Sequence, residues 1–242
     1  MKYIIGTFLL IYSLSCFAQY PFEKHPPIKY QTAKFNKIPG RKNNDNIWTA
    51  KYQNYRVELL EIRLEDSTNV VLYFKNKAIL KLKEGVDIND IALYDTQLYI
   101  ANIDNNGFPD FKIIIYNNGS GLAGSLEHKI FLFNHGKNRF QNISFMDFFA
   151  NTERDFNGDG KFEIIGQSYL SYQNHAYWVF DLYNYKKGKL VNVGKRFNYP
   201  ILTRFLASKE SYSITHNMSR KQMKQFSHAF PRDYKQGKLL VK

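Results

Sequence analysis

Short apolar and aromatic segments, separated by polar turn residues, run through the middle of the chain. Residues 55–64 alternate in part between apolar and polar positions, and residues 70–82 are apolar around a turn that begins at Lys75. Residues 97–103 and 111–116 have the same character. Segments of this length that are rich in aromatic and β-branched residues are typical of strands. The pattern predicts a mainly β protein built from antiparallel sheets.

The order of these segments repeats along the chain. The hairpin glycines Gly136 and Gly188 lie 52 residues apart and the loop glycines Gly107 and Gly160 lie 53 apart, so one single-residue gap aligns both pairs. Each unit is predicted to run as strand, acidic loop, strand, long loop, strand, tight turn and strand. The sequence therefore predicts repeated four-stranded units in a partial β-propeller-like or compact β assembly. A third unit, without an acidic loop, is predicted over residues 48–82.

The last part of the chain changes in character. Met223 and Phe226 are spaced for one face of a helix, and Pro231 would end that helix. We expect a short C-terminal helix packed on the sheet, with a basic membrane- or partner-binding helix as the alternative. The predicted organisation is a signal peptide at residues 1–18, an extended leader at 19–46, a β-repeat domain at 47–206, and a basic C-terminal helix and tail at 207–242.

The N-terminus has the layout of a secretory signal peptide. Lys2 precedes a mostly apolar run over residues 4–12, and Ala18 offers a small residue for cleavage. We therefore expect an exported protein, periplasmic or extracellular, with no transmembrane segment. The alternative is a lipoprotein signal in which Cys16 is lipidated, but Ser13 stands where such signals usually carry an aliphatic residue.

Composition adds two constraints. The chain has 20 Phe, 18 Tyr and a single cysteine, Cys16, which cleavage after Ala18 would remove. An exported protein without disulfides must draw its stability from its core and from bound ligands. The formal net charge of +13 suits an acidic polymer, an anionic lipid or an acidic partner, although a solvated basic surface explains the charge without any of them. We expect no nucleic acid partner, and the oligomeric state stays open.

Two acidic loops carry the candidate chemistry. In residues 155–163, Asp155, Asn157, Asp159 and Glu163 place oxygen-bearing side chains at positions 1, 3, 5 and 9, with Gly160 at position 6. Alternate oxygens that converge on one point, with a glycine at the sharp bend, are typical of loops that bind Ca²⁺. Lys161 would add its backbone carbonyl. The three carboxylates predict a site for a divalent cation.

The first loop, residues 102–110, has the same spacing with fewer charges. Asn102 replaces the leading carboxylate and Asn106 the third ligand, which leaves Asp104 and Asp110 as the acidic groups. The second loop is therefore expected to bind more tightly. Ordinary turns use the same Asn, Asp and Gly residues without any metal. Two such loops in register between strands favour Ca²⁺, whereas Mg²⁺ prefers fewer protein ligands and retains its waters.

The motif Asp-x-Asn-x-Asp-Gly-x-x-Glu, set between strands, resembles the calcium loops of FG-GAP and VCBS-type repeats. The resemblance covers about residues 97–194 and implies β-repeat units with Ca²⁺ in their loops. It also implies metal ligands in the second loop and, by the same correspondence, in the first. Those ligands are Asp155, Asn157, Asp159, the Lys161 carbonyl and Glu163, and then Asn102, Asp104, Asn106, the Phe108 carbonyl and Asp110. The chain carries Glu where these repeats usually end in Asp, and it has room for fewer than four clear units.

No catalytic motif stands out. The sequence has no His-Glu-x-x-His, no Gly-x-Ser-x-Gly and no phosphate-binding glycine loop. Residues 117–124 are glycine-rich and are predicted as a flexible loop, while Tyr169, Tyr172, Tyr177 and Trp178 could form an aromatic binding patch or pack in the core. We expect a non-catalytic calcium-binding β-repeat module that binds a protein or glycan of the cell envelope. The alternative is an inhibitor or immunity protein directed at a cell-wall hydrolase.

Overall fold

The computed structural model describes residues 20–39, 46–62, 67–85, 96–117, 119–149, 151–205 and 209–238. The predicted signal peptide with Cys16, part of the predicted leader and the predicted boundary after residue 206 lie outside these residues. Within the part of the chain that is described, no helix is long and apolar enough to cross a membrane.

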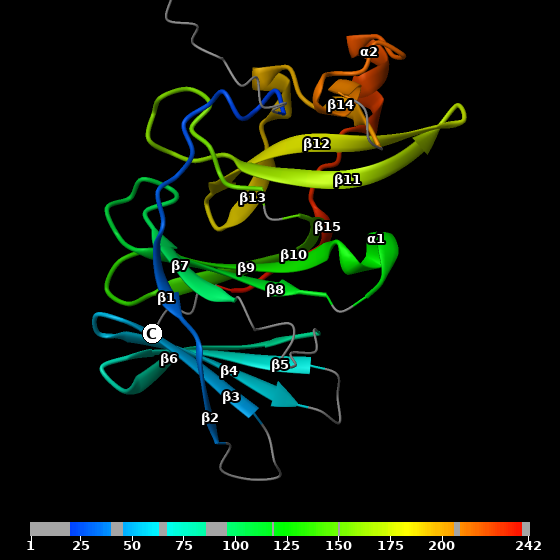
Figure 1. Ribbon diagram of the computed structural model, residues 1–242. Coiled ribbons are helices and arrows are strands. Elements are labelled where there is room, and N and C mark those ends of the chain that lie inside the picture. Colours follow the sequence, from blue (N-terminus) through cyan, green and yellow to red (C-terminus); the bar gives the residue numbers. More distant parts are fainter. Residues whose placement is uncertain are drawn as a thin grey trace, which may run out of the picture.

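Three antiparallel sheets are stacked as layers, called here the lower, middle and upper sheets (Figure 1). The lower sheet has the strand order β2-β3-β4-β5-β6. Its strands are β2 (Asn36–Pro39), β3 (Asn46–Tyr52), β4 (Tyr55–Ile62), β5 (Ser67–Phe74) and β6 (Lys77–Glu84). Lys75 and Asn76, at φ 45° and 64°, form the two-residue turn between β5 and β6. This hairpin confirms the turn predicted at Lys75.

The middle sheet has the order β1-β7-β8-β9-β10-β15 and so combines both ends of the chain with its centre. Its strands are β1 (Gln31–Lys34), β7 (Gln97–Ala101), β8 (Asp110–Tyr116), β9 (Leu126–Asn134), β10 (Phe140–Phe148) and β15 (Arg232–Gln236). The glycine-rich segment before β9 contains a one-turn helix, α1 (Gly121–Gly124), where the sequence predicted only a loop. The first repeat unit corresponds to β7 through β10.

The upper sheet is centred on the long strand β12, which pairs with β11 on one side and with β13 and β14 on the other. Its strands are β11 (Ile164–Tyr172), β12 (His175–Lys186), β13 (Lys189–Asn192) and β14 (Ile201–Arg204). The connection between β11 and β12 is a two-residue turn, Gln173 and Asn174, both at positive φ. The long loop predicted in the second unit is therefore replaced by a tight turn, because β11 continues further than its apolar start indicated.

The short helices lie mainly around the upper sheet and near the C-terminus. They are η2 (Gly194–Phe197), η3 (Lys209–Tyr212), α2 (Arg220–Met223) and η4 (Lys224–Phe226). Ser219 caps α2 by a reciprocal pair of bonds with Gln222, and Met223 is buried beneath it. The expected C-terminal helix is present but ends well before Pro231. The chain then forms β15, an edge strand of the middle sheet that the sequence did not predict.

The middle sheet is covered on both faces. One core joins it to the lower sheet and includes Trp48 and Phe111, and a second core joins it to the upper sheet and includes Phe131 and Tyr183. Burial on both faces explains the consecutive apolar residues at 113–115 in β8 and at 130–133 in β9, since neither strand has a solvent-facing side there. The described strands form a mainly β, antiparallel structure as predicted, and they do not close into a barrel or propeller.

Candidate calcium loops

The second acidic loop is organised by its own carboxylates. Asp155 Oδ1 accepts hydrogen bonds from the backbone N–H groups of Asn157 at 3.2 Å and Gly158 at 2.6 Å, and its Oδ2 accepts from Gly160 N–H at 2.9 Å. Gly158 and Gly160 have φ of 73° and 77°, a region that L side chains rarely adopt. These bonds wrap the loop around the Asp155 carboxylate. Oδ1 accepts two bonds, whereas Oδ2 accepts one and keeps a second lone pair that could bind an ion.

Two oxygens of this loop are buried without a hydrogen bond. Glu163 is 0% exposed, and its Oε2 accepts from Phe156 N–H at 2.9 Å while its Oε1 has no partner. Asn157 Oδ1 is buried and unpartnered as well, although its amide nitrogen donates to Asp159 Oδ2 at 2.9 Å. A buried oxygen without a donor costs free energy unless a ligand satisfies it. Both oxygens belong to the set that the sequence predicted as metal ligands.

Burial dominates the electrostatics of Glu163. Burial raises the pKa of Glu163, and the bond from Phe156 together with the neighbouring Asn184 side chain offsets only part of that effect. Asp159 lies on the exposed side of the loop, where donors from Asn157 and Lys161 outweigh slight burial and lower its pKa. A cation placed between these groups would reverse the effect of burial on Glu163.

The side-chain oxygens of the first loop already accept hydrogen bonds from within the loop and from β9. Asn102 Oδ1 accepts from Asn106 N–H at 2.9 Å, and Asp104 accepts from both the backbone and the amide of Asn106. Asp110, at position 9, accepts from Ile103 N–H through one oxygen and from Asn134 N–H through the other, each at 2.8 Å. The free oxygen of Glu163 therefore has no counterpart in Asp110. This contrast agrees with the expected order of the two loops.

Burial dominates the acidic groups of the first loop too. It raises the pKa of Asp110 to about 8; the charge of Asp104 adds to the effect, and the backbone N–H groups of Asn134, Ile103 and Asp104 oppose it. Burial also raises the pKa of Asp104. Phe108, whose carbonyl was the remaining expected ligand, has a side chain that is 44% exposed and lies against Gly136.

The two loops lie against each other, which the sequence did not predict. Asn105 Nδ2 donates to the Asp159 carbonyl at 3.0 Å, and Phe162 N–H donates to the Ile103 carbonyl at 3.0 Å. An added Cβ at Gly160 would lie 2.7 Å from the Asn105 amide and would displace that side chain. The position 6 glycine of the second loop thus serves both its turn and the contact between loops.

The N-terminal segment covers the second loop. Asp155 N–H donates to the Pro26 carbonyl at 3.0 Å, and the Arg154 guanidinium donates to the carbonyls of Glu23 and His25. His25 stacks on Phe156 with a ring separation of 4.2 Å. A cavity of about 620 Å³ lies between this segment, both loops and the β3–β4 turn. Part of the predicted leader is therefore built into the candidate site.

The predicted ligands do not form a compact carboxylate cluster. Among the described residues, no three His, Cys, Asp or Glu side chains gather closely enough to hold a metal by themselves. The predicted set instead mixes carboxylates with an amide oxygen and the carbonyl of Lys161, which suits the hard oxygen coordination of Ca²⁺. Glu163 and Asn157 supply oxygens that are already unpartnered. Asp155 and Asp159 would bind the ion in addition to the hydrogen bonds that they already accept.

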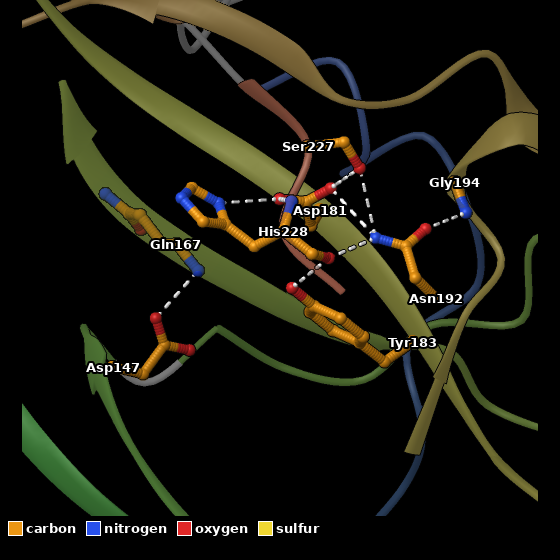
Figure 2. A network of polar contacts seen from close by, with 8 residues as sticks. All are labelled: Asp147, Gln167, Asp181, Tyr183, Asn192, Gly194, Ser227 and His228. Atoms are coloured by element: carbon orange, nitrogen blue, oxygen red, sulfur yellow. Dashed lines mark hydrogen bonds and ion pairs between the residues drawn. The ribbon is translucent and has the colours of Figure 1, made fainter. Parts of the chain in front are cut away.

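A second polar centre lies around Asp181, on the strand β12 (Figure 2). Ser227 Oγ donates to Asp181 Oδ1 at 2.8 Å, and His228 Nδ1 lies 3.2 Å from Oδ2. Asn192 also donates to this carboxylate, at 3.1 Å. The serine and the histidine share one carboxylate, and no bond joins them to each other, so this is not the hydrogen-bonded order of a Ser-His-Asp triad. Its contacts fasten the C-terminal segment to the upper sheet.

The predicted aromatic patch is divided between core and surface. Tyr177 and Trp178 are buried, whereas Tyr169 is 39% exposed and packs edge-on against Trp178. Tyr172 is half-buried and meets Phe226 of η4. Core packing therefore accounts for at least half of the four residues.

No protein family profile, curated protein or solved structure matches the chain significantly.

Proposed function

We propose that this protein is an exported, non-catalytic binding module whose second acidic loop holds a structural Ca²⁺. The observation that carries the proposal is the pair of buried, unpartnered oxygens, Glu163 Oε1 and Asn157 Oδ1. They belong to a loop whose spacing resembles FG-GAP and VCBS-type calcium loops. The first loop, with its oxygens already bonded, is proposed to bind the ion weakly or to act as a plain turn.

The proposed ion would stabilise the junction between the middle and upper sheets. The first loop connects β7 to β8, the second loop leads into β11, and the two are joined by the bonds of Asn105 and Phe162. An ion that binds only the folded state stabilises it by linkage. Calcium would thus stabilise the packing between the middle and upper sheets as well as the second loop itself.

The proposed binding role is directed at a protein or glycan of the cell envelope. The cavity of about 620 Å³ beside the loops is lined by both polar groups and apolar side chains such as Ile100 and Phe162. Concave surfaces of this size are typical of ligand sites. The polar network at Asp181 offers no activated nucleophile, which favours binding over catalysis.

Thermal unfolding in EDTA, in CaCl₂ and in MgCl₂ tests the calcium proposal. At a CaCl₂ concentration about 100 times the dissociation constant, linkage predicts a rise in Tm of roughly 5–10 °C, with little change in MgCl₂. An unchanged Tm in CaCl₂ would refute the structural role of calcium.

The variant Glu163→Gln separates the site from a general salt effect. The raised pKa of Glu163 means that, without an ion, ionisation of this buried group destabilises the fold above its ordinary pKa. We expect Glu163→Gln to unfold in EDTA at the wild-type Tm or slightly above it, and to lose the rise in CaCl₂. Asp159→Ala should reduce the rise and Asp104→Ala should reduce it less. A larger loss in Asp104→Ala would reverse the order of the two loops.

A further inference from the structure

A cleft of about 510 Å³ lies between the lower and middle sheets. It is formed by the β5–β6 hairpin and the β9–β10 hairpin, whose turns lie at the same end of the stacked sheets (Figure 1). We call it the basic cleft, and its described lining is Phe74, Lys77, Ile79, Lys137, Asn138, Arg139 and Phe140. None of the lining residues belongs to the candidate calcium site.

The floor of the basic cleft is apolar and firmly held. Tyr55 packs against Phe74 and Phe140, at ring separations of 5.1 Å and 5.7 Å, and its hydroxyl donates to Asn138 Oδ1 at 2.8 Å. Ile79 is the unpaired residue of a register shift between β5 and β6. Such bulges redirect a side chain and are common beside binding sites. The floor is therefore a preformed surface that joins the two hairpins.

The walls carry positive charge only. Lys77, Lys137 and Arg139 line the cleft, and no carboxylate does so among the described residues. Lys137 and Asn138, at φ 52° and 57°, follow Gly136 at 76°, so three successive residues occupy the left-handed region. Side chains other than glycine adopt this conformation at a cost, and such strain is concentrated at functional sites. This turn and the residue that precedes β10 contribute Lys137 and Arg139 to the cleft.

We propose that the basic cleft binds an acidic saccharide, a sugar unit that bears carboxylate or phosphate groups. Lys77, Lys137 and Arg139 pair with the negative groups, and the half-buried ring of Phe74 with Ile79 contacts an apolar C–H face of the sugar. The volume suits one or two sugar units. This inference rests on the proposed binding role and names its ligand class and its location, but it is independent of the calcium loops.

Titration calorimetry with defined saccharides tests the inference. The probes are trigalacturonic acid for carboxylates, glucose 1,6-bisphosphate for phosphates and maltotriose as the neutral control, each at 20 mM and 200 mM NaCl. We expect at least one acidic probe to bind, more weakly in high salt because charges are screened, and maltotriose not to bind. The tighter of the two acidic probes identifies the acidic group. Failure of both to bind, or equal binding of maltotriose, would overturn the proposal.

Matched variants locate the binding. Lys137→Gln/Arg139→Gln removes two cleft cations, and Lys51→Gln/Lys81→Gln removes two exposed cations outside the cleft, so both variants have the same net charge. We expect the first pair to lose at least tenfold in affinity and the second pair less than twofold. Equal losses would show a diffuse charge effect and overturn the site. Tighter binding of single-stranded DNA that the cleft variant abolishes would overturn the saccharide assignment.

The Tm in CaCl₂, measured on the same samples, reports on the acidic loops alone. If CaCl₂ does not raise the Tm but an acidic saccharide binds, the calcium proposal is rejected and the cleft proposal is retained. If CaCl₂ raises the Tm but no acidic saccharide binds, the cleft proposal is rejected and the calcium proposal is retained.

Discussion

At the level of single residues, the two acidic loops differ in one carboxylate oxygen at position 9. Position 9 is Asp110 in the first loop, and both of its oxygens accept backbone N–H groups from Ile103 and Asn134. Position 9 is Glu163 in the second loop, where Oε2 accepts the equivalent bond from Phe156 N–H. Its Oε1 accepts no hydrogen bond from the backbone, although the Asn184 side chain lies beside the carboxylate. This difference is the basis for proposing Ca²⁺ at the second loop.

Two buried ion pairs hold lysines inside the middle sheet. Lys112 Nζ lies 2.6 Å from Glu153 Oε1, and Lys129 Nζ lies 2.7 Å from Asp147 Oδ2, with all four side chains almost fully buried. Burial lowers the pKa of Lys112; it opposes the ionisation of Glu153 as well, but Lys112 and the hydroxyl of Tyr30 outweigh it and lower the pKa of Glu153. These strands contain lysine although both faces are covered, because each charge has a partner within hydrogen-bonding distance.

The variant Lys129→Met should destabilise the protein by about 3–5 kcal/mol at pH 7, because it leaves Asp147 buried without its cation. Burial already raises the pKa of Asp147, so the loss should shrink at pH 4, where this carboxyl is closer to protonation. Urea denaturation at the two pH values checks this. Lys81→Met, on the exposed part of β6, is the control and should change stability by less than about 0.5 kcal/mol. A loss that does not vary with pH would contradict the explanation.

At the level of elements, the C-terminal segment ties the upper sheet to the middle sheet. It begins with α2 above Tyr177 and Val179, is fastened at Asp181, and ends as β15 beside β10. Tyr183 donates to the His228 carbonyl at 3.1 Å, and Gln141 donates to the Gly237 carbonyl at 2.8 Å (Figure 2 shows the first of these). The segment is held by discrete polar contacts more than by apolar area.

His228 should make this attachment dependent on pH. The hydrogen bond to Asp181 raises the pKa of His228, so its contribution is full below the ordinary histidine pKa and is lost as pH rises through the folded value. His228→Gln should be less stable than wild type at pH 5.5 and equal to it at pH 8.5. The difference should be about 1 kcal/mol at most, since the ring is partly exposed. Urea denaturation measures it, with His175→Gln at the β11–β12 turn as the control, and a constant difference across this range would reject the mechanism.

At the level of the whole molecule, the middle sheet is shared by both neighbouring layers. Besides the two apolar cores, Glu84 at the end of β6 accepts from Ser144 of β10 at 3.0 Å and lies 3.2 Å from His128 of β9. The lower sheet therefore has both apolar and polar contacts with the middle sheet. Loss of either neighbouring layer would expose one of the two apolar cores and the buried polar groups packed beside it.

We therefore expect the three layers to unfold together. The chain contains two tryptophans, and each reports on a different layer: Trp48 packs between the lower and middle sheets and Trp178 packs in the upper sheet. In Trp48→Phe and Trp178→Phe, the remaining fluorescence should change at the same denaturant concentration as the far-UV circular dichroism of that variant. If the Trp48 signal were lost while most of the β structure persisted, the lower sheet would be an independent unit.

The sequence by itself determined the features that depend on neighbouring residues. Strand alternation, the turns at Lys75 and Gly188, the capped helix after Ser219 and the oxygen spacing of Asp155 through Glu163 all arise within short stretches, so local geometry fixes them. These features suffice for a mainly β antiparallel protein with two cation-type loops. They also located the C-terminal helix, though not its early end.

Only the tertiary structure decided which groups are satisfied and which surfaces are open. The freedom of Glu163 Oε1, the contact between Asn105 and Asp159, and the pairing of β15 with β10 depend on segments far apart in the chain. The basic cleft joins hairpins about 60 residues apart, at Lys77 and Lys137. Burial and hydrogen-bond partnership are properties of packing between layers, and no local pattern encodes which layer covers a given face.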